Sequence, residues 1–133
     1  IFGGDGMLTE EFIADAAGAT EGAYASFFAP DVTAIDSAAP VVEAYTQQYG
    51  EVGPFGPPAY VATMVALEAI ERAARSGELS RERVIAEVAA TQQANSLLGI
   101  PIAFDAKGDI EGASFFLFEV RDGVVYILRV RHG

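Results

Sequence analysis

The pair Asp122-Gly123 constrains the fold more than any other feature of this sequence, because it separates two runs of strand-forming residues. A two-residue loop of this composition favours a type I′ turn, in which both central residues take positive φ. The sequence therefore predicts a β-hairpin that pairs residues 114–120 with residues 124–130. Aromatic residues in such a strand usually pack in a core, and three are expected to do so here: Phe115, Phe116 and Phe118.

Residues 1–28 predict a strand, a helix and a second strand. Ile1-Phe2 is typical of the end of a strand that runs into the glycine-rich turn at residues 3–6. Thr9 is the expected N-cap of the helix, which Gly18 should end. Residues 21–28 have strand composition at their aromatic end. This order of elements predicts an α/β fold.

The middle of the chain predicts three helices. The first should begin with Ser37 as its N-cap, carry Pro40 in its first turn and close at Gly50. Its apolar residues share one side: Val41, Val42, Tyr45 and Tyr49.

The second and longest helix is expected over residues 60–75, after the proline-rich turn at residues 53–58. The spacing of its apolar residues predicts a buried face formed by Tyr60, Met64, Leu67, Ile70 and Ala74. A third helix, capped by Ser80, should run to about Gln93 with Val84, Ile85 and Val88 turned inward. An extended segment at residues 100–104 and a turn at residues 105–109 follow.

Composition limits the possible functions. The chain has 133 residues, the size of one domain, and 51% of them are hydrophobic, enough for a core. Nineteen acidic residues against eight basic ones give a net charge of −11, a field that repels phosphate backbones and argues against nucleic acid as a partner. There is no cysteine, which excludes thiolate metal sites and cysteine nucleophiles.

The start of the chain is unusual. It opens on apolar Ile1-Phe2 without an initiator methionine or a signal sequence, so we expect it to be a piece of a longer protein. No run of about 18 apolar residues predicts a membrane-spanning helix.

The sequence contains little that indicates a catalytic site or a metal site. The spacing of Asp105, Asp109 and Glu111 resembles that of calcium ligands, but Lys107 interrupts it, and a structural turn is favoured. His132 is the single histidine and has no carboxylate or serine at a recognisable spacing. Residues 3–6 lack the spacing of a dinucleotide or phosphate-binding loop. We therefore expect no enzyme activity, no metal and no cofactor.

Asp5 is the main candidate for a binding residue. A carboxylate on a glycine-flanked turn at the end of a strand lies where α/β folds open to ligands, and it can accept hydrogen bonds from a ligand ammonium group. The alternative is that Asp5 only bonds amides of its own turn. Phe55 and Tyr60 flank the proline-rich turn and either form an aromatic wall for an aliphatic ligand or simply pack.

Several motifs, taken in order, resemble one family. The first is Phe2-Gly3-Gly4-Asp5-Gly6, and the second is Ala17-Gly18 with residues 20–24. The third is Tyr49 before the proline-rich turn, with the helix from Tyr60 to Ile70. The last is residues 99–109, which contain Phe104-Asp105 and Gly108-Asp109. Together they resemble the C-terminal part of the solute-binding proteins of branched-chain amino acid ABC transporters, the leucine/isoleucine/valine-binding family.

The resemblance implies part of a type I periplasmic binding protein, whose two α/β lobes close on a small ligand. Residues 1–28 would belong to the second lobe, residues 37–94 would be helices of the first, and residues 99–131 would return as strands and hairpin. Asp5 would bind the α-amino group of the ligand, and Gly4 would shape the turn beside it. The permease of an importer would be the partner, at the periplasmic or extracellular face of the membrane.

A chain that holds only part of two lobes should leave helix faces open. We therefore expect a homo-oligomer or a dimer that exchanges elements between chains. Two further readings stay open: a ligand-sensing regulatory domain of the same fold, and a self-sufficient oligomerising α/β domain without a ligand.

Overall fold

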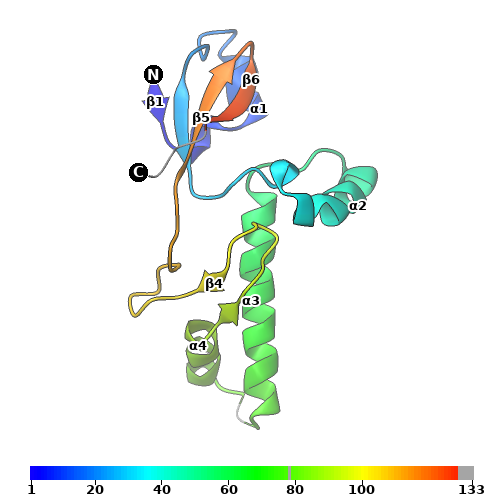
Figure 1. Ribbon diagram of the computed structural model, residues 1–133, viewed down its shortest axis with the longest axis vertical. Coiled ribbons are helices and arrows are strands. Elements are labelled where there is room, and N and C mark those ends of the chain that lie inside the picture. The colour runs from blue at the N-terminus through cyan, green and yellow to red at the C-terminus, as the bar shows by residue number, and fades with distance from the viewer. Residues whose placement is uncertain (78, 129–133) are drawn as a thin grey trace. The chain divides into compact units, whose positions relative to one another are not determined.

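The computed structural model describes residues 1–77 and 79–128, which belong to two compact units. Unit 1 contains Ile1–Asp31 and the chain from Ser114 onward, and unit 2 contains Val32–Ala113. Figure 1 shows how the elements follow one another along the chain. The mixed α/β architecture predicted from the sequence is confirmed.

Unit 1 is built on a four-stranded sheet in the order β1-β2-β5-β6. Its strands are β1 (Phe2–Gly3), β2 (Tyr24–Phe27), β5 (Phe116–Arg121) and β6 (Val124–Leu128). β1 and β2 run parallel, and the other neighbours are antiparallel. The side chains of Ala25, Phe27, Phe118 and Val120 are buried and form the core of this unit.

The β5–β6 hairpin confirms the prediction from Asp122-Gly123. Arg121 pairs with Val124, and the two residues between them have φ values of 52° and 72°. The predicted pairing reached Val130, which lies outside the described residues. Phe118 is buried, but the expectation for Phe115 is wrong: it precedes the first paired residue of β5 and is 74% exposed.

The connection between β1 and β2 contains the 3₁₀ turn η1 (Asp5–Met7) and helix α1 (Glu10–Asp15). Thr9 caps α1 as predicted, since its Oγ1 accepts a hydrogen bond from the Phe12 amide at 3.2 Å. The helix ends at Asp15, before the predicted Gly18, because Ala17 already takes a positive φ of 47°.

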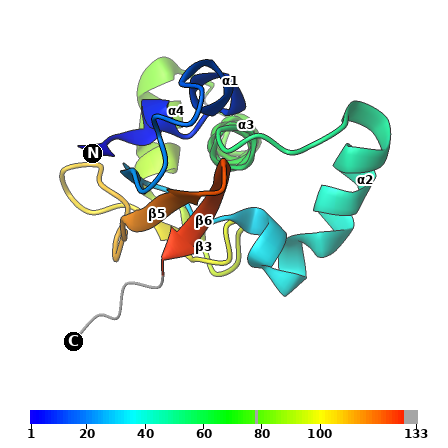
Figure 2. The same ribbon diagram turned by 90° about the horizontal axis from the view of Figure 1, so that it is seen from above.

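Unit 2 contains helices α2 (Ala39–Tyr49), α3 (Gly56–Arg75) and α4 (Arg81–Ala89). The 3₁₀ turns η2 (Val32–Ala34) and η3 (Asp36–Ala38) precede α2, and strands β3 (Gln92–Gln93) and β4 (Ile102–Ala103) form a small antiparallel sheet. α3 packs along α4, and both views place α2 and α4 on opposite sides of α3 (Figures 1 and 2).

Three of the predicted helix ends in unit 2 differ from the structure. α3 begins at Gly56 rather than Tyr60, because Pro57 and Pro58 lie in the first helical turn, where no amide donor is needed. Ser37 does not cap α2: it lies within η3, the chain turns directly into the helix, and the cap position is Ala38 without a side-chain hydrogen bond. Ser80 does cap α4, accepting a hydrogen bond from the Arg83 amide at 3.1 Å. α4 ends at Ala89 rather than near Gln93, because Gln92 and Gln93 pair with β4 instead.

The predicted buried face of α3 is wrong. The helix buries Val61, Val65, Ala69 and Ala73. Tyr60, Leu67, Ile70 and Ala74 are exposed, and Met64 is only partly covered. α3 carries apolar residues on two sides, and small residues at 69 and 73 allow a close approach to the chain that packs there. The predicted inward placement of Ile85 on α4 is also wrong, since this residue is 61% exposed.

Within the described residues, no helix combines the length and the apolar character needed to cross a membrane.

Candidate ligand-binding sites

Asp5 lies at the carboxyl end of β1, as the first residue of η1. Its side chain is exposed, and its Oδ1 accepts a hydrogen bond from the Gly6 amide at 3.0 Å. Because β1 runs parallel to β2, this is the sheet edge at which α/β folds bind ligands. The local hydrogen bond is the one expected of a turn residue, and it involves one of the two carboxylate oxygens.

The glycines before Asp5 differ in what surrounds them. A Cβ on Gly3 would lie 1.8 Å from the Met7 sulfur, so the side chain of Met7 covers this position. A Cβ on Gly4 would meet no atom within 4 Å. The Gly4 carbonyl accepts a hydrogen bond from the Met7 amide at 3.1 Å, which closes the turn and presents Asp5 on its outer side.

Phe55 and Tyr60 lie at the amino end of α3, in unit 2. Phe55 is the N-cap residue, and its carbonyl accepts a hydrogen bond from the Ala59 amide at 3.2 Å. Both rings are partly exposed, at 42% and 49%. Asp5 and Gly4 belong to unit 1, so each unit contributes two of the four predicted residues, and their meeting in one site stays a prediction.

A cavity of about 420 Å³ lies within unit 2, beside Tyr60. Its volume is in the range of small-molecule sites. Val41, Val61, Met64 and Leu97 give it apolar walls, and polar groups come from Ser37, Glu68, Gln93, Asn95 and Ser96. Sequence reasoning found Tyr60 but missed the others. The polar residues Gln93, Asn95 and Ser96, which lie close together after α4, are the one sequence signal in this region.

The loop that borders this cavity has a fixed shape. Ser96 Oγ donates a hydrogen bond to the Ile100 carbonyl at 2.6 Å and accepts one from the Leu98 amide at 3.2 Å. Gly99 has a φ of +67°, and a Cβ there would lie 3.2 Å from a methyl group of Ile35. Only glycine satisfies both conditions without strain.

The turn at residues 105–109 has the structural role predicted for it. Asp105 Oδ1 accepts hydrogen bonds from the amides of Lys107 at 2.8 Å and Asp109 at 3.0 Å. The carboxylate thus closes its own turn. Among residues 1–77 and 79–128, no group of three or more acidic or histidine side chains is placed to hold a metal ion.

One buried carboxylate lies in the sheet of unit 1. Glu119 pairs with Tyr24 across β5 and β2, accepts a hydrogen bond from the tyrosine hydroxyl at 3.1 Å and forms an ion pair with Arg121. The hydrogen bond from Arg121 and that from Tyr24 hold the pKa of Glu119 below its ordinary value. The hydrogen bond to Glu119 and its negative charge raise the pKa of Tyr24.

Comparison with solved structures finds 26 chains that match this one. A leucine binding protein from Thermotoga maritima MSB8 is 32% identical, with a TM-score of 0.81. The match covers 97% of this chain and 36% of that protein. A comparison with models of protein families and one with curated proteins found no match.

Two more distant structures have the same fold. An ABC transporter substrate-binding protein from Desulfitobacterium hafniense, in complex with Leu, is 22% identical over 89% of this chain and 39% of its own, with a TM-score of 0.68. A fatty acid ABC transporter substrate-binding protein from Thermomonospora curvata is 19% identical over 96% of this chain and 35% of its own, with a TM-score of 0.76.

The chain thus spans little more than a third of the proteins it matches, and nearly all of its own residues take part. The resemblance carried by the sequence motifs is confirmed. In sequence and in fold, this chain is similar to the C-terminal part of the substrate-binding proteins of ABC transporters, of the leucine-binding type.

Proposed function

We propose that the chain is part of the solute-binding component of an ABC importer, which binds a small amino acid with an aliphatic side chain and does no catalysis. The observation that supports this most is the similarity to a leucine binding protein over 97% of the chain at 32% identity. The type of ligand is drawn from that relative. The permease of the importer is the proposed partner, and the site of action is the periplasmic or extracellular face of the membrane.

Asp5 is the proposed contact to the ammonium group of the ligand. It is exposed, it follows a parallel strand, and one of its oxygens is already oriented by the Gly6 amide. A carboxylate held in this way can accept charge-assisted hydrogen bonds without first ordering its own turn. The open space above Gly4 lets a ligand approach the backbone beside Asp5.

Phe55 and Tyr60 are the proposed apolar contacts. Their partly exposed rings at the start of α3 offer the surface that an aliphatic side chain would cover. They belong to unit 2, whereas Asp5 belongs to unit 1. The 133-residue chain alone is expected to bind leucine with a dissociation constant in the millimolar range or weaker, since it lacks most of a relative's length.

The proposal can be tested in a hybrid protein in which residues 1–133 replace the matching segment of the Thermotoga maritima leucine binding protein. Folding is checked by circular dichroism and thermal unfolding, and leucine and octanoate are then titrated by calorimetry. Binding of leucine, without binding of octanoate, is expected. A folded hybrid that binds octanoate, or that binds neither compound, would contradict the proposed ligand class.

A further inference from the structure

Met7 fills the space that a side chain on Gly3 would occupy. A Cβ on Gly3 would lie 1.8 Å from the sulfur of Met7, 3.1 Å from its Cγ and 3.4 Å from its Cε. Gly3 lies in strand β1 and has no positive φ, so its backbone conformation does not require a glycine. The close contact with Met7 does.

This contact lies on the face of the sheet that carries the core of unit 1. Gly3 pairs with Ala25 of β2, and the side chains of paired residues point to the same face. Ala25 is buried, Met7 is partly buried, and the turn η1 packs against β2. Methionine suits such a position, because its unbranched side chain can follow an irregular surface. Met7 thus supplies the apolar side chain that β1 lacks at Gly3.

Asp5 lies between the two ends of this contact. The Met7 amide donates a hydrogen bond to the Gly4 carbonyl at 3.1 Å, and the Leu8 amide donates one to the Asp5 carbonyl at 3.0 Å. A single 3₁₀ turn held by such bonds alone is marginal in water. Here the side chain of Met7 rests on Gly3, so residues 3–7 form a closed loop with the exposed Asp5 in its middle.

Closure of this loop limits the positions of the Asp5 carboxylate. The main chain of η1 cannot move away from β1 while Met7 occupies the space at Gly3. The Gly6 amide orients the carboxylate Oδ1 at 3.0 Å. The turn is thus ordered before a ligand arrives, and the binding step does not have to order it.

We propose that Met7 is a positioning residue for ligand binding: by packing on Gly3 it fixes η1 against β1 and holds the Asp5 carboxylate ready for the ammonium group of the ligand. This inference rests on the proposed function and extends it to a residue that acts through Asp5 rather than through contact with the ligand.

Leucine affinity in the hybrid protein is the first test. Met7→Ala should weaken leucine binding about tenfold, because the turn is no longer preorganised. Met7→Leu should stay within about threefold of the parent hybrid, since a leucine δ carbon can take the place of the sulfur. An unchanged affinity in Met7→Ala, or an equal loss in Met7→Leu, would overturn the proposal.

Leu117→Ala is the matched control. Leu117 lies on β5, on the opposite face of the sheet, and is partly buried like Met7. The two side chains have the same number of non-hydrogen atoms. This variant should lower the melting temperature but leave leucine affinity within about twofold. Equal weakening of leucine binding by Leu117→Ala and Met7→Ala would show a general loss of stability and would also overturn the proposal.

A double-mutant cycle tests whether Met7 acts through Asp5. In an Asp5→Ala hybrid, the additional change Met7→Ala should alter leucine affinity by less than about twofold, because the group that Met7 positions is already absent. A further tenfold loss in that background would show that Met7 acts independently of Asp5.

A second pair of changes separates positioning from simple packing. The methyl group of Gly3→Ala lies where the Met7 sulfur was, so adding Gly3→Ala to Met7→Ala should restore part of the lost melting temperature. Leucine affinity should stay low, because this methyl group belongs to β1 and does not connect the turn to the strand. Recovery of affinity together with stability would mean that Met7 only fills space.

The order of the turn can also be measured without a ligand. In the 133-residue chain, Met7→Ala should increase the exchange of the Gly6 and Leu8 amides with water at least about fivefold by NMR, and Leu117→Ala should not. Unchanged exchange in Met7→Ala would overturn the inference, whether or not the hybrid binds leucine. Failure of the parent hybrid to bind leucine would instead contradict the proposed function.

Discussion

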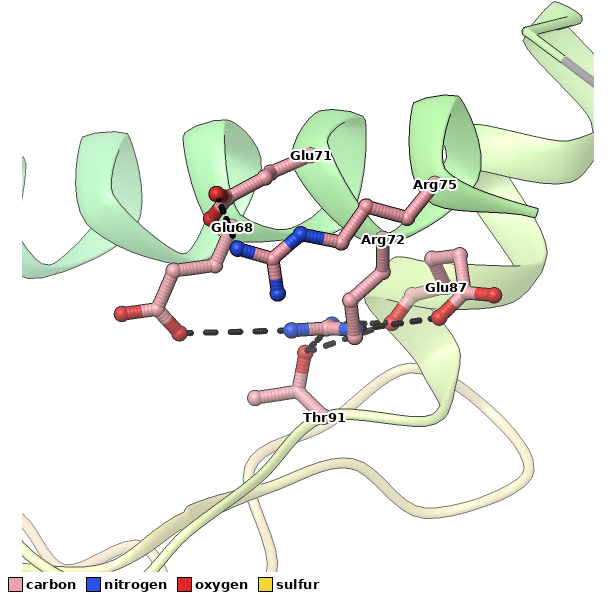
Figure 3. A network of polar contacts seen from close by, with 6 residues as sticks. All are labelled: Glu68, Glu71, Arg72, Arg75, Glu87 and Thr91. Carbon is pink, nitrogen blue, oxygen red and sulfur yellow. Dashed lines mark hydrogen bonds and ion pairs between the residues drawn. The ribbon is translucent and has the colours of Figure 1, made fainter. Parts of the chain in front are cut away.

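Arg72 of α3 binds Glu87 of α4 in two ways at once. Its Nε donates a hydrogen bond to the Glu87 carboxylate at 3.0 Å, and its Nη2 donates one to the Glu87 carbonyl at 2.8 Å (Figure 3). The same guanidinium lies 4.0 Å from Glu68 and 3.5 Å from the buried Thr91 hydroxyl. Arg72 thus connects both helices to the chain that leaves α4.

Replacing Arg72 with alanine should lower the free energy of unfolding by about 1–2 kcal/mol, because a charge-assisted pair and a bond to the last turn of α4 are lost together. Urea denaturation followed by circular dichroism measures the effect. Arg75→Ala is the control: Arg75 is largely exposed and pairs with Glu71 of the same helix, so a change below about 0.5 kcal/mol is expected. If Arg72→Ala and Arg75→Ala lowered the free energy of unfolding equally, the contacts of Arg72 with α4 would contribute nothing to stability.

Gly99 is expected to be the least replaceable glycine near the cavity of unit 2. Alanine there meets the Ile35 methyl group and also has to adopt a positive φ, whereas alanine at Gly108 meets only the second condition, with open space around it. Gly108→Ala should therefore cost about 1 kcal/mol, and Gly99→Ala about 1 kcal/mol more. Thermal unfolding of both variants is the measurement. Equal melting temperatures of Gly99→Ala and Gly108→Ala would show that the contact with Ile35 does not affect stability.

Stability at acid pH should depend on Glu119. Its pKa is lowered in the folded chain from an ordinary 4.5, so its contribution is present above that value and is lost as pH falls through the folded-state pKa. Glu119→Gln should flatten the acid limb of a plot of stability against pH. An unchanged acid limb in this variant would contradict the assignment.

The partner of Glu119 acts at the other end of the pH range. The pKa of Tyr24 is raised from an ordinary 10.0, so its contribution is present below that value and is lost as pH rises through the folded-state pKa. Tyr24→Phe removes the titrating hydroxyl and should flatten the alkaline limb while leaving most of the acid limb in place. Urea midpoints from pH 3 to 11 measure both limbs.

Local signals in the sequence predicted local structure well. Asp122-Gly123 defines its hairpin, and Thr9 and Ser80 cap their helices, because each of these features depends on neighbouring backbone groups alone. Ser37 failed because the 3₁₀ turn before α2 was not recognised.

Packing was harder to predict than the elements themselves. The spacing of Tyr60, Leu67 and Ile70 identified an apolar side of α3, but Val61 and Val65 on the opposite side are the residues that α3 buries. Which side is covered depends on elements distant in sequence, and periodicity does not contain this information. The polar lining of the cavity in unit 2 was missed for the same reason, since residues from three segments meet there.

The most direct test of the solute-binding proposal is calorimetric titration of leucine into the hybrid protein with and without Asp5→Ala. Loss of the carboxylate should weaken leucine binding by about a hundredfold or more, because the ligand ammonium loses its charged partner. Asp15→Ala, which removes another exposed carboxylate, at the end of α1, should leave the affinity within about twofold. A folded Asp5→Ala hybrid that binds leucine as tightly as its parent would contradict the central role of Asp5.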